Sequence, residues 1–177
     1  MKWMIASDIH GSACYAQQLL DAFDREGADR LLLLGDILYH GPRNDLPAAY
    51  DPKAVIALLN PRKAVLCCVR GNCDTEVDQM VLDFPILADY LILPWNDRLI
   101  YATHGHHFNP RSPLPMGTDD ILLNGHTHIP AWEAHYWNPG SVSIPKEGSA
   151  RGYMVLTDDA CQWKALADGA VIHEIVL

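Results

Sequence analysis

The sequence lacks the cysteine patterns that mark disulfide-rich and zinc-ribbon proteins. Its five cysteines, an odd number, include no C-x-x-C pair, so neither a disulfide framework nor a structural zinc site is indicated. No apolar run approaches the roughly 20 residues that a membrane helix requires. The apolar stretch near the N-terminus meets Asp8 too early to be a signal peptide. We therefore expect a cytoplasmic protein with no membrane association.

Basic residues are also scarce. The chain has 13 Lys and Arg against 22 Asp and Glu, a formal net charge of -9, and the basic residues form no cluster. Stable nucleic-acid binding is not expected, because it depends on many contacts between basic side chains and phosphates. Acidic residues that bind metal are counted here as free anions, and two divalent ions would offset about four units of charge at one site.

Apolar residues make up 49% of the 177 residues, enough for one folded domain over residues 1–177 with a real core. Buried strands are predicted at residues 2–7, 31–34 and 64–69, and helices at 13–25 and 52–59, the first of them after Ser12 as N-cap and ended by Gly27. This alternation indicates parallel strands with crossover helices. Residues 40–51 are predicted to form a loop.

The second half is rich in strands. They are predicted at residues 90–94, 99–103, 121–123, 132–137, 153–156, 162–166 and 171–176. The expected fold is therefore α/β, with two mixed sheets packed as a sandwich and helices outside. Cys67 and Cys68 are neighbours on one strand, so their side chains should point to opposite faces.

Polar residues with metal-binding side chains follow apolar strands five times. They are Asp8, His10, Asp36, Asn72, His104, His126 and His128. Each alone has an ordinary structural explanation, such as a turn or cap residue for Asp36 or Asn72. Ligands bind at the carboxyl ends of strands in open α/β sheets, so the whole set predicts one convergent site.

Carboxylate, imidazole and amide ligands together suit Mn²⁺, Fe, Zn²⁺, Co²⁺ or Ni²⁺ better than Ca²⁺. Seven ligands are too many for one such ion but suffice for two if one carboxylate bridges them. Two ions about 3.5–4 Å apart can hold an attacking hydroxide and orient a phosphoryl group. The residues therefore predict an enzyme that hydrolyses phosphate esters at two divalent metal ions.

The same motifs resemble those of the calcineurin-like metallophosphoesterases, and most closely the small bacterial YfcE-type phosphodiesterases. The order and spacing fit over essentially the whole chain. The matching segments are Asp8-Ile9-His10, Gly35-Asp36, Gly71-Asn72-Cys73-Asp74, Thr103-His104-Gly105-His106, Gly125-His126-Thr127-His128 and the turn Asn138-Pro139-Gly140-Ser141.

The resemblance implies a four-layer α-β-β-α fold and assigns the ligands. Three residues would hold a first ion: Asp8, His10 and His128. Three would hold a second: Asn72, His104 and His126. Asp36 would bridge the two ions, for which manganese is the leading candidate. The candidate catalytic residues are Asp36, Asn72, Cys73 and His106.

Cys73 departs from the wider family pattern, which has a histidine credited with protonating the leaving group. A thiol, with an ordinary pKa of about 8.5, is a poor replacement as a proton donor, and Cys73 can equally be a small packed residue. Asp74 can orient a ligand or merely form a turn, and His106 can contact substrate or support a ligand. Arg43 in the loop after Asp36 can clamp phosphate or be simply solvated.

The favoured function is a phosphodiesterase of small substrates. A phosphomonoesterase is the nearest alternative. A binding scaffold is a third, since a retromer subunit of the same fold works by binding partners. Homo-oligomerisation is left open.

Overall fold

The computed structural model describes residues 1–176 of the chain. Six strands form one sheet: β1 (Trp3–Ala6), β2 (Arg30–Leu33), β3 (Leu66–Cys68), β9 (Gly152–Leu156), β10 (Ala160–Ala165) and β11 (Val171–Val176). Five form another: β4 (Tyr90–Trp95), β5 (Arg98–Thr103), β6 (Ile121–Leu123), β7 (Pro130–Trp132) and β8 (Tyr136–Pro139). The helices are α1 (Ala13–Glu26), α2 (Pro52–Leu59), the 3-10 helix η1 (Asn60–Arg62) and α3 (Glu76–Gln79).

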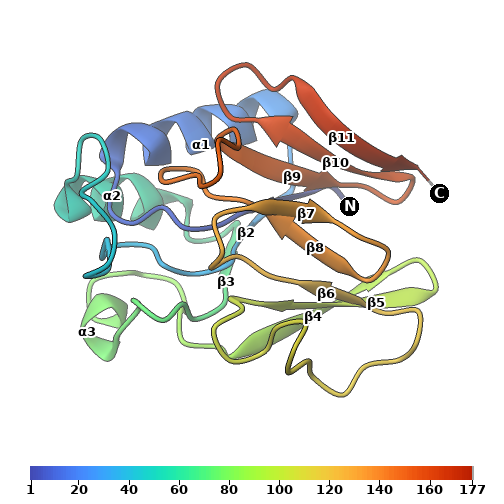
Figure 1. The fold of residues 1–177 in the computed structure, drawn as a ribbon. Coiled ribbons are helices and arrows are strands. Elements are labelled where there is room, and N and C mark those ends of the chain that lie inside the picture. The colour runs from blue at the N-terminus through green and yellow to red at the C-terminus, as the bar shows by residue number, and fades with distance from the viewer. Residues whose placement is uncertain (177) are drawn as a thin grey trace.

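Both sheets mix parallel and antiparallel pairs. The first has the order β11-β10-β9-β1-β2-β3, in which β1, β2 and β3 are parallel. The second has the order β4-β5-β6-β8-β7, in which β5, β6 and β8 are parallel. The sheets stack with α1 and α2 outside the first (Figure 1). The predicted sandwich of two mixed sheets with flanking helices is confirmed.

The alternation of side chains along the strands divides the core into two layers. Met4 belongs to the apolar cluster under α1 and α2, whereas its neighbour Ile5 belongs to the cluster between the sheets. Cys68 and Cys67 divide in the same way, the first under the helices and the second between the sheets. The prediction that these two cysteines face opposite sides is confirmed.

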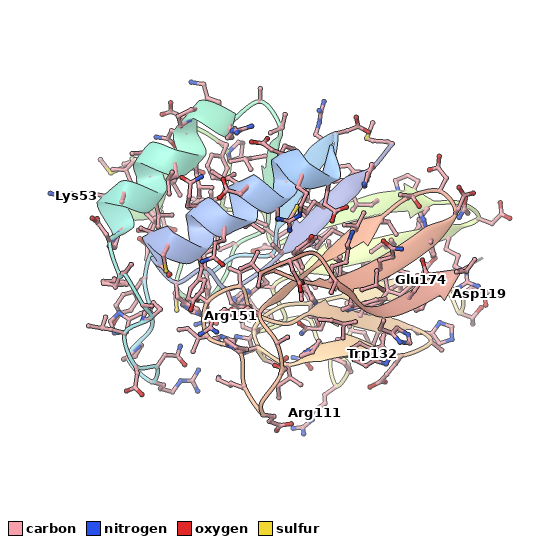
Figure 2. All side chains as sticks on the ribbon, turned by 90° about the horizontal axis from the view of Figure 1, so that it is seen from above. Lys53, Arg111, Asp119, Trp132, Arg151 and Glu174 are labelled. Atoms are coloured by element: carbon pink, nitrogen blue, oxygen red, sulfur yellow. The ribbon has the colours of Figure 1, made fainter. Side chains whose placement is uncertain are left out.

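Seen from above, α1 and α2 lie over the sheet, and Lys53 of α2 points away from the molecule (Figure 2). α1 begins after Ser12 and ends at Gly27 as predicted. The hydroxyl of Ser12, however, donates to the carbonyl of Ala48 at 2.6 Å and makes no cap hydrogen bond. None of the helices within residues 1–176 is long and apolar enough to cross a membrane.

The structure differs from the sequence predictions at two places. The single strand predicted over residues 132–137 is wrong, because this segment contributes to two antiparallel strands, β7 and β8, with Trp132 opposite Trp137. Its turn lacks Gly and Pro and is instead stabilised by a hydrogen bond from Trp137 Nε1 to the Glu133 carbonyl. The short α3 was not predicted, although Thr75 and Asp78 form a capping box at its start.

Candidate metal centre

The loops after β1, β2, β3, β5 and β6 meet at one edge of the sandwich, toward the left in Figure 1. Backbone hydrogen bonds join them, from Asp8 to Gly35 and from Gly125 to His104. The amide of His126 also donates to Asp8 Oδ2 at 3.0 Å, which ties the two sheets together. All seven predicted ligands lie in these loops, since the parallel strands end at the same edge.

Three of the ligands form a first group. Asp8 Oδ1 lies 3.4 Å from His10 Nε2 and 3.2 Å from His128 Nε2. The two imidazole nitrogens are 3.2 Å apart. All three side chains are buried, and their ligand atoms are close enough together to hold one ion.

The remaining ligands form a second group and a link. His104 Nε2 lies 3.1 Å from both Asn72 Oδ1 and His126 Nδ1. Asp36 Oδ2 lies 3.5 Å from His104 Nε2 and 3.7 Å from His10 Nε2. One carboxylate oxygen of Asp36 therefore faces both groups.

Backbone carbonyls fix the orientation of three imidazoles. His10 Nδ1 bonds to the carbonyl of Tyr39 at 2.8 Å, and His104 Nδ1 to that of Leu34 at 2.6 Å. His128 Nδ1 bonds to the Ile144 carbonyl in the same way. A nitrogen that bonds a carbonyl must carry the proton, so in each neutral ring Nε2 presents its lone pair to the centre.

The residues fit a bound cation. The lone pairs of His10 and His128 face each other at 3.2 Å, an arrangement that a positive charge between them would stabilise. Asp8 Oδ2 accepts hydrogen bonds from Ser7 and His126, but the buried Oδ1 has no hydrogen-bond donor among the residues that the structure describes. A buried carboxylate oxygen without a donor is costly, and a metal ion would satisfy it.

The pKa values of His104 and Asp8 also indicate that positive charge is favoured at this centre. Burial lowers the pKa of His104, but the hydrogen bond to Asp36 and the charge of Asp8 outweigh it and raise the pKa to about 9. Burial opposes ionisation of Asp8 as well, yet the imidazoles of His10 and His128 beside its carboxylate hold its pKa well below the ordinary value. Protons would therefore compete with a metal ion for this site.

Five of the seven ligands have strained backbones. Their φ angles lie in the left-handed region: Asp8 60°, His10 50°, Asp36 56°, His126 64° and His128 62°. This conformation costs a non-glycine residue roughly 1–2 kcal/mol, and such strain concentrates at functional sites. The surrounding loops hold these residues where the strand ends alone would not place them.

Two glycines make room for the carboxylates. A Cβ at Gly71 would collide with the carboxylate of Asp36, and one at Gly125 would collide with the hydroxyl of Ser7 beside Asp8. Both glycines precede a ligand in the sequence. Their role is therefore close approach of the backbone to the carboxylate of Asp36 and to Ser7 beside Asp8, both aspartates being predicted metal ligands.

Asp74 fastens the two loops that carry Asp36 and Asn72. Its buried carboxylate accepts backbone N–H bonds from Asp36 at 2.8 Å, Gly71 at 2.7 Å and Ile37 at 2.9 Å. Burial, with a contribution from the charge of Asp36, raises the pKa of Asp74. Of the two roles considered for Asp74, the structure favours orienting a ligand loop.

The turn at residues 138–141 supports the site from the other side. The hydroxyls of Ser141 and Ser143 both donate to the carbonyl of Asp8 at 2.8 Å. Asn138 Nδ2 donates to the carbonyl of Gly125 at 2.7 Å. The role of Ser143 was not predicted, because this residue belongs to no motif and is only close to the turn in the sequence.

A cleft of about 400 Å³ opens over the centre. Its lining residues are Asp36, Gly41, Pro42, Arg43, Asn44, Asn72, Cys73, His126, Thr127, His128 and Lys146. Arg43 and Lys146 make no ion pair with a carboxylate within residues 1–176. The contribution of Lys146 was not predicted, because no motif surrounds it.

Cys73 lies at the side of this cleft, where Asn72 Nδ2 contacts its sulfur at 3.3 Å and its amide donates to Asp36 Oδ1 at 2.8 Å. Burial and the charge of Asp36 raise the pKa of the Cys73 thiol far above its ordinary value. The thiol is therefore protonated at neutral pH and holds its proton strongly.

His106 lies beside the centre without lining the cleft. Its ring centroid is 5.3 Å from that of His104, and it borders a separate hollow with Arg70 and Asp89. Burial, reinforced by the charge of His104, lowers its pKa to about 4, so its ring is neutral at pH 7. The neighbouring His107 is exposed.

Known proteins resemble this chain in sequence and in structure. Residues 1–160 match the profile of the Calcineurin-like phosphoesterase superfamily domain. Phosphodiesterase YfcE of Escherichia coli (strain K12) is 43% identical over 181 residues, covering 100% of this chain and 98% of that protein.

Solved structures have a similar fold. That of YfcE, a phosphoesterase from E. coli, superposes with a TM-score of 0.93 over 99% of both chains at 43% identity. At lower identity the likeness concerns the fold alone: an archaeal phosphodiesterase has a TM-score of 0.62 at 23% identity over 100% of both chains. A Vps29 mutant from Entamoeba histolytica has 0.63 at 19%, covering 100% and 99%. The chain belongs to the calcineurin-like phosphoesterase superfamily.

Proposed function

We propose that this chain is a phosphodiesterase that hydrolyses small phosphodiesters with two divalent metal ions. Membership of the superfamily makes the chain a metal-dependent phosphoester hydrolase. One observation carries the dinuclear part of the proposal: Asp36 Oδ2 faces His10 Nε2 at 3.7 Å and His104 Nε2 at 3.5 Å. A carboxylate placed between two ligand groups suits a bridge between two ions.

The ligands divide between the ions by their positions. Asp8, His10 and His128 would hold the first ion, and Asn72, His104 and His126 the second, with Asp36 shared. Oxygen and imidazole nitrogen together suit manganese, our first candidate, and also iron, zinc, cobalt and nickel. When bound, such a pair of ions lowers the pKa of a coordinated water and neutralises charge that develops on a phosphoryl group.

The chain's own residues contribute binding and orientation. Arg43 and Lys146 form no ion pair in the described part of the chain, and they supply positive charge on the cleft wall, where either can bind the free oxygens of a phosphate group. Asp74 and the serines behind Asp8 hold the ligand loops in register. His106, packed against His104, we assign as a positioning residue.

The preference for diesters rests on the relatives. The thiol of Cys73 is a poor proton donor to a departing alcohol, which disfavours diesters and monoesters alike when their leaving groups are poor. A relative 43% identical over the whole chain is named a phosphodiesterase.

Two other functions can be distinguished from this one by experiment. The positive charges of Arg43 and Lys146 would also suit the dianion of a phosphomonoester. Phosphomonoesterase activity is therefore the second candidate. A purely binding role is disfavoured, because all seven ligand positions carry competent residues. Five of them lie in groups close enough to hold an ion, and Asn72 and His126 each lie 3.1 Å from His104 Nε2.

The test compares hydrolysis of bis(p-nitrophenyl) phosphate with that of p-nitrophenyl phosphate, with and without Mn²⁺. We expect Mn²⁺-dependent cleavage that is faster for the diester. Asp36→Asn should abolish it and reduce the number of ions bound per chain below two. Asp119→Asn, an exposed residue at the molecular edge (Figure 2), is the matched control and should behave as wild type.

Faster cleavage of the monoester would make the chain a phosphatase. No cleavage of either ester with Mn²⁺, Fe²⁺, Zn²⁺, Co²⁺ or Ni²⁺ would refute the hydrolase and bring the scaffold role forward.

A further inference from the structure

A second hollow adjoins the metal cleft, and its lining is mainly apolar. It has a volume of about 410 Å³ and is formed by Leu38, Tyr39, Tyr50, Pro52, Ile56, Cys73, Thr75, Val77, Asp78 and Val81. The lining comes from the loop after β2, from the start of α2 and from the segment around α3. Two of these segments, the loop after β2 and the segment that begins at Cys73, also contribute residues to the metal cleft.

The hollow connects directly with the chemistry. Cys73 lines both this hollow and the metal cleft. Tyr39 lines the hollow, and its carbonyl accepts the bond from His10 Nδ1 that orients this predicted ligand. A molecule with its phosphoryl group at the metal centre therefore has this hollow within reach, past Cys73.

Large apolar side chains lie exposed around it. Val77 is 69% exposed, Val81 43% and Tyr39 43%. Single exposed apolar residues are ordinary, but here several share one concave surface, which is the usual character of a ligand site. These three side chains do not contribute to the packing of the core, because none of them belongs to the two apolar clusters.

Two polar side chains of the hollow are bonded to each other. Asp78 Oδ2 accepts hydrogen bonds from the backbone and hydroxyl of Thr75 at 2.7 and 2.9 Å. These bonds cap α3. Because most of the remaining lining is apolar, recognition in this hollow depends mainly on apolar contact, in contrast with the cleft wall that carries Arg43 and Lys146.

We infer that this hollow is a subsite for an apolar group of the substrate, an alkyl or aryl ester group attached to the phosphoryl centre. The inference rests on the proposed function. It narrows the substrate class to phosphodiesters with one apolar ester group, placed beside Cys73. Val77 and Val81 are then specificity-determining residues of the reaction.

The test uses n-alkylphosphonates, from methyl to pentyl, as ligands with a carbon–phosphorus bond that the enzyme does not hydrolyse. Their affinity for the Mn²⁺-loaded protein is measured by calorimetry. Complete burial of a methylene would tighten binding about fourfold. For this open hollow we expect about twofold per methylene, half the free energy of complete burial.

Two separate variants, Val77→Asn and Val81→Asn, should each reduce this dependence on chain length while leaving methylphosphonate affinity unchanged. Both positions are exposed, and neither change adds charge. The matched control is Met80→Asn, an 83% exposed apolar residue of the same segment that does not line the hollow. It should keep the wild-type dependence.

Equal affinity for all chain lengths in the wild type would overturn the inference, as would failure of every alkylphosphonate to bind. An unchanged dependence in both Val variants, or an equal loss in Met80→Asn, would also overturn it. Ester hydrolysis separates the two proposals. If affinity depends on chain length but no ester is cleaved, the proposed function is refuted and the inference about the hollow still holds. If diesters are cleaved but affinity does not depend on chain length, only the inference about the hollow is refuted.

Discussion

The carboxylate of Asp74 offers the sharpest test of how the metal centre is held. Replacement by Asn keeps the shape but leaves one acceptor oxygen. If that oxygen keeps the bonds from Asp36 and Gly71, the new NH₂ group faces the N–H of Ile37, and two donors oppose each other. The change therefore removes at least one hydrogen bond to a charged group in a buried place.

The magnitude follows from those contacts. A hydrogen bond to a charged group contributes about 1.5–3 kcal/mol, and a buried donor left unsatisfied adds to the loss. We expect Asp74→Asn to lower the free energy of unfolding by about 2–4 kcal/mol. Because Asp74 fixes the backbone of Asp36, metal affinity should fall about 10–100-fold, as is typical when a group supporting a metal ligand is removed.

Urea unfolding of the metal-free protein and calorimetric metal titration measure the two effects. Asp51→Asn is the control, because exposed Asp51 caps α2 through one backbone N–H at 3.0 Å and lies outside the cleft lining. It should cost about 1 kcal/mol or less and leave metal affinity unchanged. Wild-type metal affinity in Asp74→Asn would refute the claim that this carboxylate positions the bridging ligand.

Three further predictions follow from other parts of the molecule. Cys73→His should raise turnover of alkyl phosphate esters by supplying a better proton donor; no change, or a loss, would count against an acid deficit there. Arg43→Ala should raise KM about tenfold with little change in kcat, whereas Arg111→Ala, at an exposed loop (Figure 2), should have no effect. Although burial raises the pKa of Glu26, the hydrogen bonds from Lys164, Tyr153 and Lys2 together outweigh it and leave the pKa below the ordinary value. Its stabilisation should therefore be present above about pH 4.5 and be lost as the pH falls through the folded pKa. Glu26→Gln should lower stability by about 1–3 kcal/mol at pH 7 and by less at pH 3, as urea unfolding at both pH values would show.

Much of the fold was predictable from local pattern. The strand–helix alternation of the first half and the Ser12 and Gly27 limits of α1 agree with the structure. The strand predicted over residues 132–137 failed because its apolar, aromatic pattern suits one strand or two equally well. The turn depends on the bond from Trp137 to Glu133, which exists only once the chain has folded back.

The sequence by itself determined the family and the residue types of the site, because the ligands sit in short motifs at fixed distances from apolar strands. Tertiary structure alone decided how they are used. The place of Asp36 between His10 and His104 depends on loops from both sheets meeting. The left-handed backbones of the ligands and the three-way bond of Asp74 depend on the same meeting. Lys146 and the apolar hollow beside Cys73 had no motif, because cavities form from residues distant in the chain, and local sequence carries no record of such contacts.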